Sequence, residues 1–167
     1  MNPRILVTYA TRAGSTTEVA AVIGEALAKR GFAVEVKPVK AKPSVGGYQA
    51  VVLGSAIRMG RWLPEMMDFI KQNQPALGGV PVALFSVHML NTGDDEASQA
   101  ARTAYTVPVH QHLAPASEAF FAGKMDYARL SFLDGLIAKA VGSQTGASVG
   151  DRRDWDRIRS WAEAILA

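Results

Sequence analysis

The sequence predicts an α/β fold in which helices cover both faces of a parallel β-sheet. Two patterns favour this class. Short apolar segments, each long enough for one strand, alternate with segments of helical periodicity along the whole chain. The first of these segments, Ile5-Leu6-Val7, is an unbroken apolar run, as expected for a parallel strand that is buried on both faces. Ligands of such sheets bind beyond the carboxyl ends of the strands, so the loops at those ends are the first candidates for a site.

The first half of the chain contains three predicted strands. Ile5–Val7 is followed by a helix whose apolar face consists of Val19, Val22, Ile23, Ala26 and Leu27, and Gly31 should end this helix. Residues 32–36 form the second strand. The segment 38–48 has two prolines and two glycines, which predicts a loop with at most one helical turn. The continuous apolar run of residues 50–54 is the third strand.

The middle of the chain continues the alternation. Pro64 suits the first turn of a helix whose apolar stripe is Leu63, Met66, Met67 and Ile70. Residues 80–87 form the fourth strand. Acidic residues at 94–96 suit the start of a helix that runs to Tyr105, and Pro108 should end or kink it.

The last third carries an unusual apolar insert. It occupies residues 129–141, between a fifth strand at 117–122 and a final helix that starts near Asp151 or Asp154 and turns Trp155, Ile158, Ala162 and Ile165 inward. As a helix the insert is apolar on more than one face. Two interpretations remain open: an internal helix, or a face that contacts a membrane surface or a second copy of the chain. Cations flank the insert at Lys124, Arg129 and Lys139.

Composition excludes several classes of function. A chain of 167 residues with 49 % hydrophobic residues predicts one domain over residues 1–167. The chain has no cysteine, which excludes disulfides, thiolate catalysis and Cys-ligated metal centres. The net charge of +3 is scattered, so no nucleic-acid surface is expected. We expect neither a signal peptide nor a membrane span, and hence a cytoplasmic protein, which a membrane contact of the insert would place at the inner face of the membrane.

The loop after the first strand is the strongest candidate site. Thr11–Thr16 is rich in hydroxyls and small residues, and Ser15 with Glu18 fits a capping box in which Ser15 is the N-cap. The backbone N–H groups and the dipole of such a helix start suit a phosphate. A plain helix start would have the same pattern. The loop lacks the spacing of a Walker loop and of the dinucleotide fingerprint.

Two further loops are expected at the same edge of the sheet. Residues 55–62 contain Arg58, Gly60, Arg61 and Trp62, which indicates ligand contact, although solvated arginines and a tryptophan packed beneath the next helix are the alternative. Residues 86–93 contain His88, which suits contact with a ligand ring. His110 and His112 stand two apart with no acidic cluster beside them, so no metal site is expected.

These motifs together resemble a known family. Thr11, Gly14, Ser15 and Thr16 fill the hydroxyl and glycine positions of the flavodoxin phosphate loop. The arginine at position 12 of this loop is similar to that of one branch of the family, which is related to menaquinone-dependent protoporphyrinogen oxidases. That branch also resembles this chain in three later segments, which are Gly54-Ser-Ala-Ile-Arg58, Phe85-Ser-Val87 and Asp154-Trp155 with Ile158.

The resemblance implies a five-stranded, doubly wound sheet of order 2-1-3-4-5 with an extra helical insert after strand 5. It also implies one noncovalently bound FMN. The implied FMN contacts are Thr11, Arg12, Ala13, Gly14, Ser15 and Thr16 at the phosphate, with Ser55, Ala56, Ile57, Arg58, Met59, Gly60, Ser86, Val87, His88 and Met89 beside the ring.

The function that the resemblance implies is that of an FMN-dependent oxidoreductase, similar to protoporphyrinogen oxidases that use a quinone as acceptor. The alternative is an electron-transfer protein of the flavodoxin type, whose partner would be a redox protein instead of a small-molecule substrate. Such carriers are strongly acidic, whereas this chain is basic, which favours an anionic substrate. No acid–base residue is predicted, although His88 and Arg58 would suit a reduced, anionic flavin. A receiver domain is not expected, because it needs an acid at the end of the first strand and this chain has none there.

Overall fold

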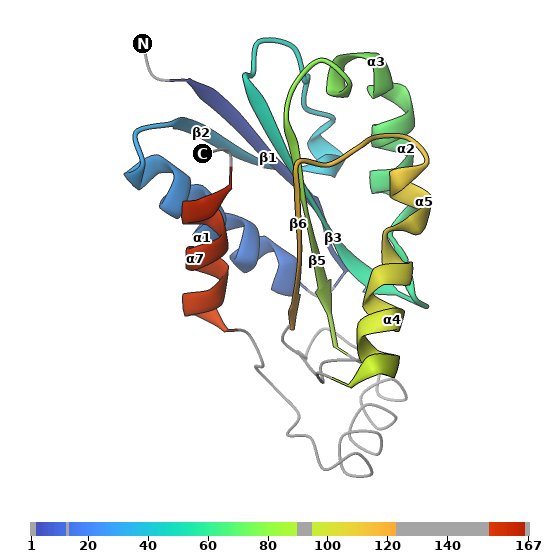
Figure 1. Cartoon of the computed structure of the whole chain (residues 1–167). Coiled ribbons are helices and arrows are strands. Elements are labelled where there is room, and N and C mark those ends of the chain that lie inside the picture. The colour runs from blue at the N-terminus through green and yellow to red at the C-terminus, as the bar shows by residue number, and fades with distance from the viewer. Residues whose placement is uncertain (1–2, 13, 90–94, 123–153, 166–167) are drawn as a thin grey trace.

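The computed structural model describes residues 3–12, 14–89, 95–122 and 154–165, and Figure 1 shows their arrangement. Five parallel strands form the main sheet in the order β2-β1-β3-β5-β6. Their bounds are β1 (Arg4–Ala10), β2 (Ala33–Pro38), β3 (Ala50–Arg58), β5 (Val82–His88) and β6 (Ser117–Ala122). The short strand β4 (Arg61–Trp62) pairs antiparallel with the end of β3. Without β4, the order is the predicted 2-1-3-4-5.

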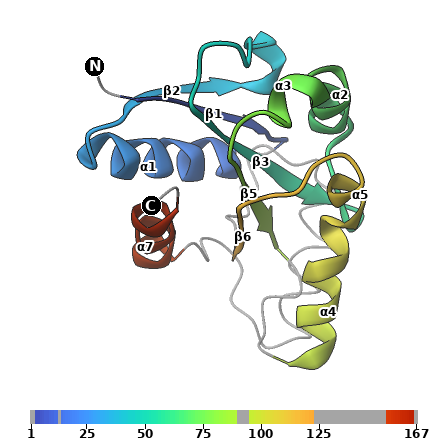
Figure 2. The same ribbon diagram turned by 45° about the horizontal axis from the view of Figure 1, so that its top comes forward.

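Helices cover both faces of this sheet (Figures 1 and 2). α1 (Ser15–Lys29) and α7 (Trp155–Ala164) lie on one face. The other face carries α2 (Pro64–Gln72), α3 (Gln74–Leu77), α4 (Glu96–Tyr105) and α5 (Val107–His110), together with the short 3-10 turn η1 (Val39–Ala41). Each face has its own core, and alternate residues of β1 serve both: Ile5 packs toward α1 and Leu6 toward α2. The doubly wound α/β prediction is therefore confirmed.

Gly54 of β3 makes room for a neighbouring aromatic ring. It lies in register with Phe85 of β5, and a Cβ atom on Gly54 would lie only 1.9 Å from Cζ of Phe85. Phe85 is fully buried, and its ring also meets that of Trp161 edge-on at 6.3 Å. A glycine at this position thus lets β3 and β5 approach with the ring between the sheet and α7.

The start of α1 differs from the prediction. The N-cap is Gly14 and not Ser15, which is the first helical residue, so the predicted capping box is wrong. Gly14 has φ 87°, a left-handed conformation that glycine adopts without steric cost. The backbone N–H of Gly14 donates to Oγ1 of Thr11 at 3.0 Å, so the turn before the helix is closed one residue earlier than expected.

Other boundaries agree more closely with the sequence. Gly31 follows the end of α1, Pro64 is the first residue of α2, and Asp95 and Asp154 cap α4 and α7 with their side chains. The fourth predicted strand begins two residues later than expected and ends one residue later. The insert at 129–141 lies outside the described residues. Among the helices that the structure describes, none has the length and apolar character needed to cross a membrane.

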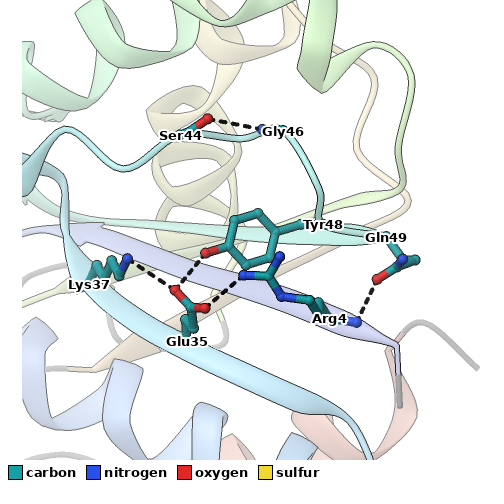
Figure 3. A network of polar contacts seen from close by, with 7 residues as sticks. All are labelled: Arg4, Glu35, Lys37, Ser44, Gly46, Tyr48 and Gln49. Atoms are coloured by element: carbon teal, nitrogen blue, oxygen red, sulfur yellow. Dashed lines mark hydrogen bonds and ion pairs between the residues drawn. The ribbon is translucent and has the colours of Figure 1, made fainter. Parts of the chain in front are cut away.

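A polar network holds the edge strand β2 (Figure 3). Glu35 accepts hydrogen bonds from Tyr48 at 2.7 Å and from Arg4 at 2.8 Å, and Lys37 pairs with it at 3.0 Å. The guanidinium of Arg4 also lies 4.6 Å from the centre of the Tyr48 ring. The hydrogen bonds from Tyr48, Arg4 and Lys37 lower the pKa of Glu35 to about 2. Arg4 and Tyr48 belong to the amino-end side of the sheet, opposite the predicted site.

Candidate functional site

The carboxyl ends of β1, β3 and β5 bring the three predicted loops to one edge of the sheet. β1 leads into the loop of residues 11–14, β3 continues into a hairpin with β4, and β5 ends at His88. Since β1 pairs with β3 and β3 with β5, the carboxyl ends of these strands are neighbours in space although they are far apart in the sequence. The strand ends therefore converge as predicted, and residues 90–93 of the third predicted loop lie outside the described residues.

The start of α1 contains a buried hydroxyl with no partner. Thr16 lies in the first turn of the helix and is 0 % exposed, yet its Oγ1 makes no hydrogen bond within the described part of the chain. Buried polar groups are normally paired, because desolvation without a hydrogen bond is costly. At a helix start, the first backbone N–H groups also have no carbonyl partner within the helix itself. An oxygen-rich anion would satisfy both kinds of group.

The side chain of Arg12, in the loop before this turn, is already paired within the protein. Its guanidinium forms a two-pronged ion pair with Glu65 in the first turn of α2, in which Nη1 bonds Oε1 and Nη2 bonds Oε2 at 2.9 Å. Hydrogen bonds from Arg12 hold the pKa of Glu65 below its usual value. The pair therefore connects the loop after β1 to the helix that follows β4.

Sequence analysis did not identify Glu65 as a site residue. Its partner lies 53 positions away, and no local pattern indicates such a pairing.

The end of β3 is a β-hairpin and not an open loop. Ile57 pairs with Trp62 and Arg58 with Arg61, so only Met59 and Gly60 form the turn. Both have positive φ, 54° and 74°, which is the signature of a type I′ turn. The prediction of a plain loop from residue 55 onward is therefore wrong: β3 extends to Arg58.

Two predicted site hydroxyls already have partners within the protein. Ser55 is fully buried and accepts a hydrogen bond from the Leu63 N–H at 3.0 Å, while it donates to the Ala56 carbonyl at 2.8 Å. Ser86 accepts from the indole N–H of Trp62 at 2.8 Å. These bonds hold the hairpin against β5 and give Trp62 a buried, structural position beneath it.

His88 is the last residue of β5 and is only 4 % exposed. Its ring lies 5.8 Å from that of Tyr105 in α4. The expectation that a loop begins at Ser86 is wrong, because Ser86, Val87 and His88 all belong to the strand. Of the other predicted residues, Met89 directly follows β5 and is partly exposed, and Ala13 lies outside the described residues.

A family model described as a flavodoxin domain matches residues 6–149. The chain belongs to the flavodoxin domain family. It is 25 % identical over 170 residues to protoporphyrinogen IX dehydrogenase [quinone] of Escherichia coli (strain K12), covering 97 % of this chain and 94 % of that protein.

Solved flavodoxins share the fold of this flavodoxin-family chain. The flavodoxin of Streptococcus pneumoniae TIGR4 has a TM-score of 0.57 and 17 % identity, and the match covers 96 % of this chain and 95 % of the other. The flavodoxin of Fusobacterium nucleatum, solved bound to flavin mononucleotide, has a TM-score of 0.52 and 13 % identity, covering 74 % of this chain and 79 % of the other.

The tip of the hairpin is the most exposed part of the site. Met59 is 93 % exposed, and Arg58, Gly60 and Arg61 are exposed as well. Within the part of the chain that the structure describes, no group of three or more His, Asp or Glu side chains is arranged to hold a metal. The described residues of this flavodoxin-family site thus offer side-chain hydroxyls, backbone N–H groups and cations.

Proposed function

We propose that this chain is an FMN-dependent oxidoreductase that oxidises a small-molecule substrate and passes the electrons to a quinone. The observation that carries the proposal is the unpaired, buried hydroxyl of Thr16 in the first turn of α1, directly after the left-handed Gly14. This arrangement fits a phosphate monoester, because the hydroxyl and the backbone N–H groups of a helix start are donors and the helix dipole favours negative charge.

The residues of the site fit the parts of FMN in the following way. The backbone of residues 11–16, with Thr16, would hold the phosphate. The segments at the ends of β3 and β5 would flank the ring, namely Ser55, Ala56, Ile57, Arg58, Met59, Gly60, Ser86, Val87, His88 and Met89. Bound FMN supplies the redox chemistry, and the protein positions it and excludes water. Ser55 both donates and accepts a hydrogen bond within the protein, so we expect its hydroxyl to support the ring site, whereas Ser86 accepts from Trp62 and keeps its O–H as a donor.

Two observations support a substrate-oxidising enzyme over a carrier protein. The Escherichia coli relative that matches nearly the whole chain is a dehydrogenase whose name includes a quinone. The formal net charge of +3 also suits a negatively charged substrate. Anaerobic mixing of the FMN-loaded protein with protoporphyrinogen IX, followed by menadione, tests this: substrate should bleach the flavin and the quinone should restore its absorbance. A flavin that only a reduced redox protein can bleach would favour the carrier instead.

The proposed phosphate site can be tested by comparing valine variants of two buried threonines, Thr16 and Thr8. Thr16 and Thr8 are both 0 % exposed, and both have a hydroxyl without a partner, but Thr8 lies within β1 and Thr16 in the proposed phosphate turn. Replacing either by valine removes an unsatisfied buried oxygen, so both variants should be at least as stable as the wild type in the absence of cofactor.

Only Thr16→Val should bind FMN more weakly, by roughly tenfold for the loss of one bond to a charged group. Flavin fluorescence titrations with FMN and riboflavin measure this. Riboflavin lacks the phosphate and should bind the two variants and the wild type equally. Equal FMN affinities of Thr16→Val and Thr8→Val would contradict the phosphate site.

A further inference from the structure

The hairpin tip carries two arginines that have no acidic partner among the residues that the structure describes. Arg58 and Arg61 are direct cross-strand neighbours at the end of β3 and in β4. Directly opposed residues of an antiparallel pair have Cα atoms roughly 5.5 Å apart when they are hydrogen-bonded, and like charges at such positions destabilise the pair. Among the described residues, neither guanidinium makes an ion pair or a hydrogen bond.

Three other described cations, at the loop after β1 and at the edge strand β2, form ion pairs with acidic side chains of the protein. Arg12 pairs with Glu65, and Arg4 and Lys37 both pair with Glu35. What distinguishes Arg58 and Arg61 from these cations is that they are directly opposed across the hairpin, and among the described residues neither has an acidic partner. An external anion with two negative groups would remove the repulsion between them.

Met59, in the turn of the same hairpin, is unusual in its backbone conformation and in its exposure. A type I′ turn favours asparagine, aspartate or glycine at its first central position, because φ is positive there. Met59 occupies this position with φ 54° and is 93 % exposed. A long apolar side chain in a strained conformation and in water is costly to the free protein, which indicates that it contacts something apolar.

The hairpin holds these three side chains on a rigid base. Successive side chains in a strand point to opposite faces, so the pair Ile57–Trp62 faces inward while Arg58 and Arg61 face the other way. Trp62 is buried and bonded to Ser86, and Ile57 packs on the core beside α2. The backbone positions of the two arginines and the methionine are therefore anchored at the edge of the sheet where the flavin is proposed to bind.

We propose that the hairpin tip of Arg58, Met59 and Arg61 is the recognition element for the substrate, and that this substrate is a large apolar molecule with a pair of carboxylates. Each arginine binds one carboxylate, and the thioether of Met59 lies against the apolar body. The proposal rests on the proposed function, since it places the substrate beside the flavin.

A membrane surface fits the tip less well. Binding of a protein element to lipid grows with the apolar area that it buries, and Met59 is the one large apolar side chain exposed on this hairpin. The other large exposed apolar residues of the described chain are Val36 on β2 and Val107 on α5, which belong to separate elements. The described residues thus form no continuous apolar face, whereas the two adjacent cations suit paired carboxylates.

The test uses the FMN-loaded protein and two probes that differ only in charge. Mesoporphyrin IX carries two propionate side chains, and its dimethyl ester has the same apolar body without the negative charges. Binding is measured by porphyrin fluorescence for the wild type, Arg58→Gln, Arg61→Gln and the double variant. The matched control is Arg159→Gln, because Arg159 is an exposed arginine on α7, away from the hairpin.

The wild type should prefer the free acid over the ester. Each single variant should bind the acid roughly five- to tenfold more weakly, as for the loss of one charge-assisted hydrogen bond. The double variant should bind acid and ester alike. An acid-to-ester preference that is the same in the wild type and the double variant would overturn the proposal.

Two further measurements separate other roles. If the double variant shifts the flavin reduction potential but keeps the acid preference, the arginines act on the flavin and the proposal is wrong. If it loses flotation with phosphatidylglycerol vesicles but keeps the acid preference, they bind lipid and the proposal is likewise wrong. Flavin absorbance is recorded throughout: a wild type that never binds FMN refutes the proposed function, whereas normal FMN binding without acid preference refutes only the role of the hairpin.

Discussion

Arg12 and Glu65 form a two-pronged ion pair that fastens the loop after β1 to the first turn of α2. The loop contains the proposed phosphate site, and α2 directly follows the hairpin that carries Met59. The two halves of the site are thus connected before any ligand arrives. This connection also occupies the guanidinium of Arg12, so that the phosphate depends on the start of α1 for its donors.

Glu65→Gln should weaken FMN binding by a small factor. Exposed ion pairs contribute about 0.2–1 kcal/mol, so we expect FMN to dissociate roughly two- to fivefold faster as the loop loosens. Stopped-flow displacement of FMN by excess apoflavodoxin or by dilution measures this rate. High salt should reproduce the effect in the wild type and not in the variant. Tighter binding in the variant would show instead that Glu65 competes with the phosphate for Arg12.

Ser55→Ala should destabilise the fold more than it affects the flavin. The substitution leaves the buried N–H of Leu63 without its acceptor, which costs about 1–3 kcal/mol. Urea denaturation of the cofactor-free protein measures the loss of unfolding free energy. If the stability is unchanged and FMN affinity falls, the hydroxyl of Ser55 bonds the flavin and its bond to Leu63 is incidental.

Met59→Asn should make the protein more stable and a poorer binder of porphyrins. Asparagine tolerates positive φ at the first position of a type I′ turn, so we expect a gain of about 1 kcal/mol in unfolding free energy. The loss of the thioether should reduce mesoporphyrin IX and dimethyl ester binding equally, since both have the same apolar body. Thermal melts and fluorescence titrations on the same samples report both effects. A variant with lower stability would contradict the assignment of strain to Met59.

Glu35→Gln should change stability only above a defined pH. The folded pKa of Glu35 is about 2, below the roughly 4.3 of an unperturbed glutamate. A lowered carboxyl pKa adds stability above the unfolded value, and this contribution disappears as the pH falls through the folded value. The melting temperature of the variant should therefore lie below that of the wild type at pH 7, with a gap that closes between pH ~4.3 and 2. Glu163→Gln on α7 is the control for removing one exposed negative charge.

The parts of the fold that follow local rules could be predicted from the sequence. Gly31 after α1 and Pro64 at the start of α2 act through their own backbone preferences, and strand periodicity located β1, β3 and β6 within a few residues. The hairpin could not be predicted, because methionine rarely occupies a position that requires positive φ. The Arg12–Glu65 pair could not be predicted either, since it depends on how two distant loops meet.

The capping error has a similar cause. Ser15 with Glu18 fits a capping box as well as any sequence does, but the backbone of Gly14 and the hydroxyl of Thr11 close the turn first. The prediction of an anion site in this segment does not depend on which residue is the cap, because it rests on the hydroxyls and the glycine between a buried strand and a helix.

Because the turn has only two residues, 59 and 60, its length decides which side chains of the hairpin lie opposite one another and therefore what the hairpin can bind. With two residues in the turn, the side chains at 58 and 61 emerge opposite one another on the same face. Inserting or deleting a single residue would shift the register of β4 and turn one of them to the other face. Proteins with this fold could therefore gain or lose selectivity for doubly charged substrates by a one-codon insertion or deletion, with both arginines still in place.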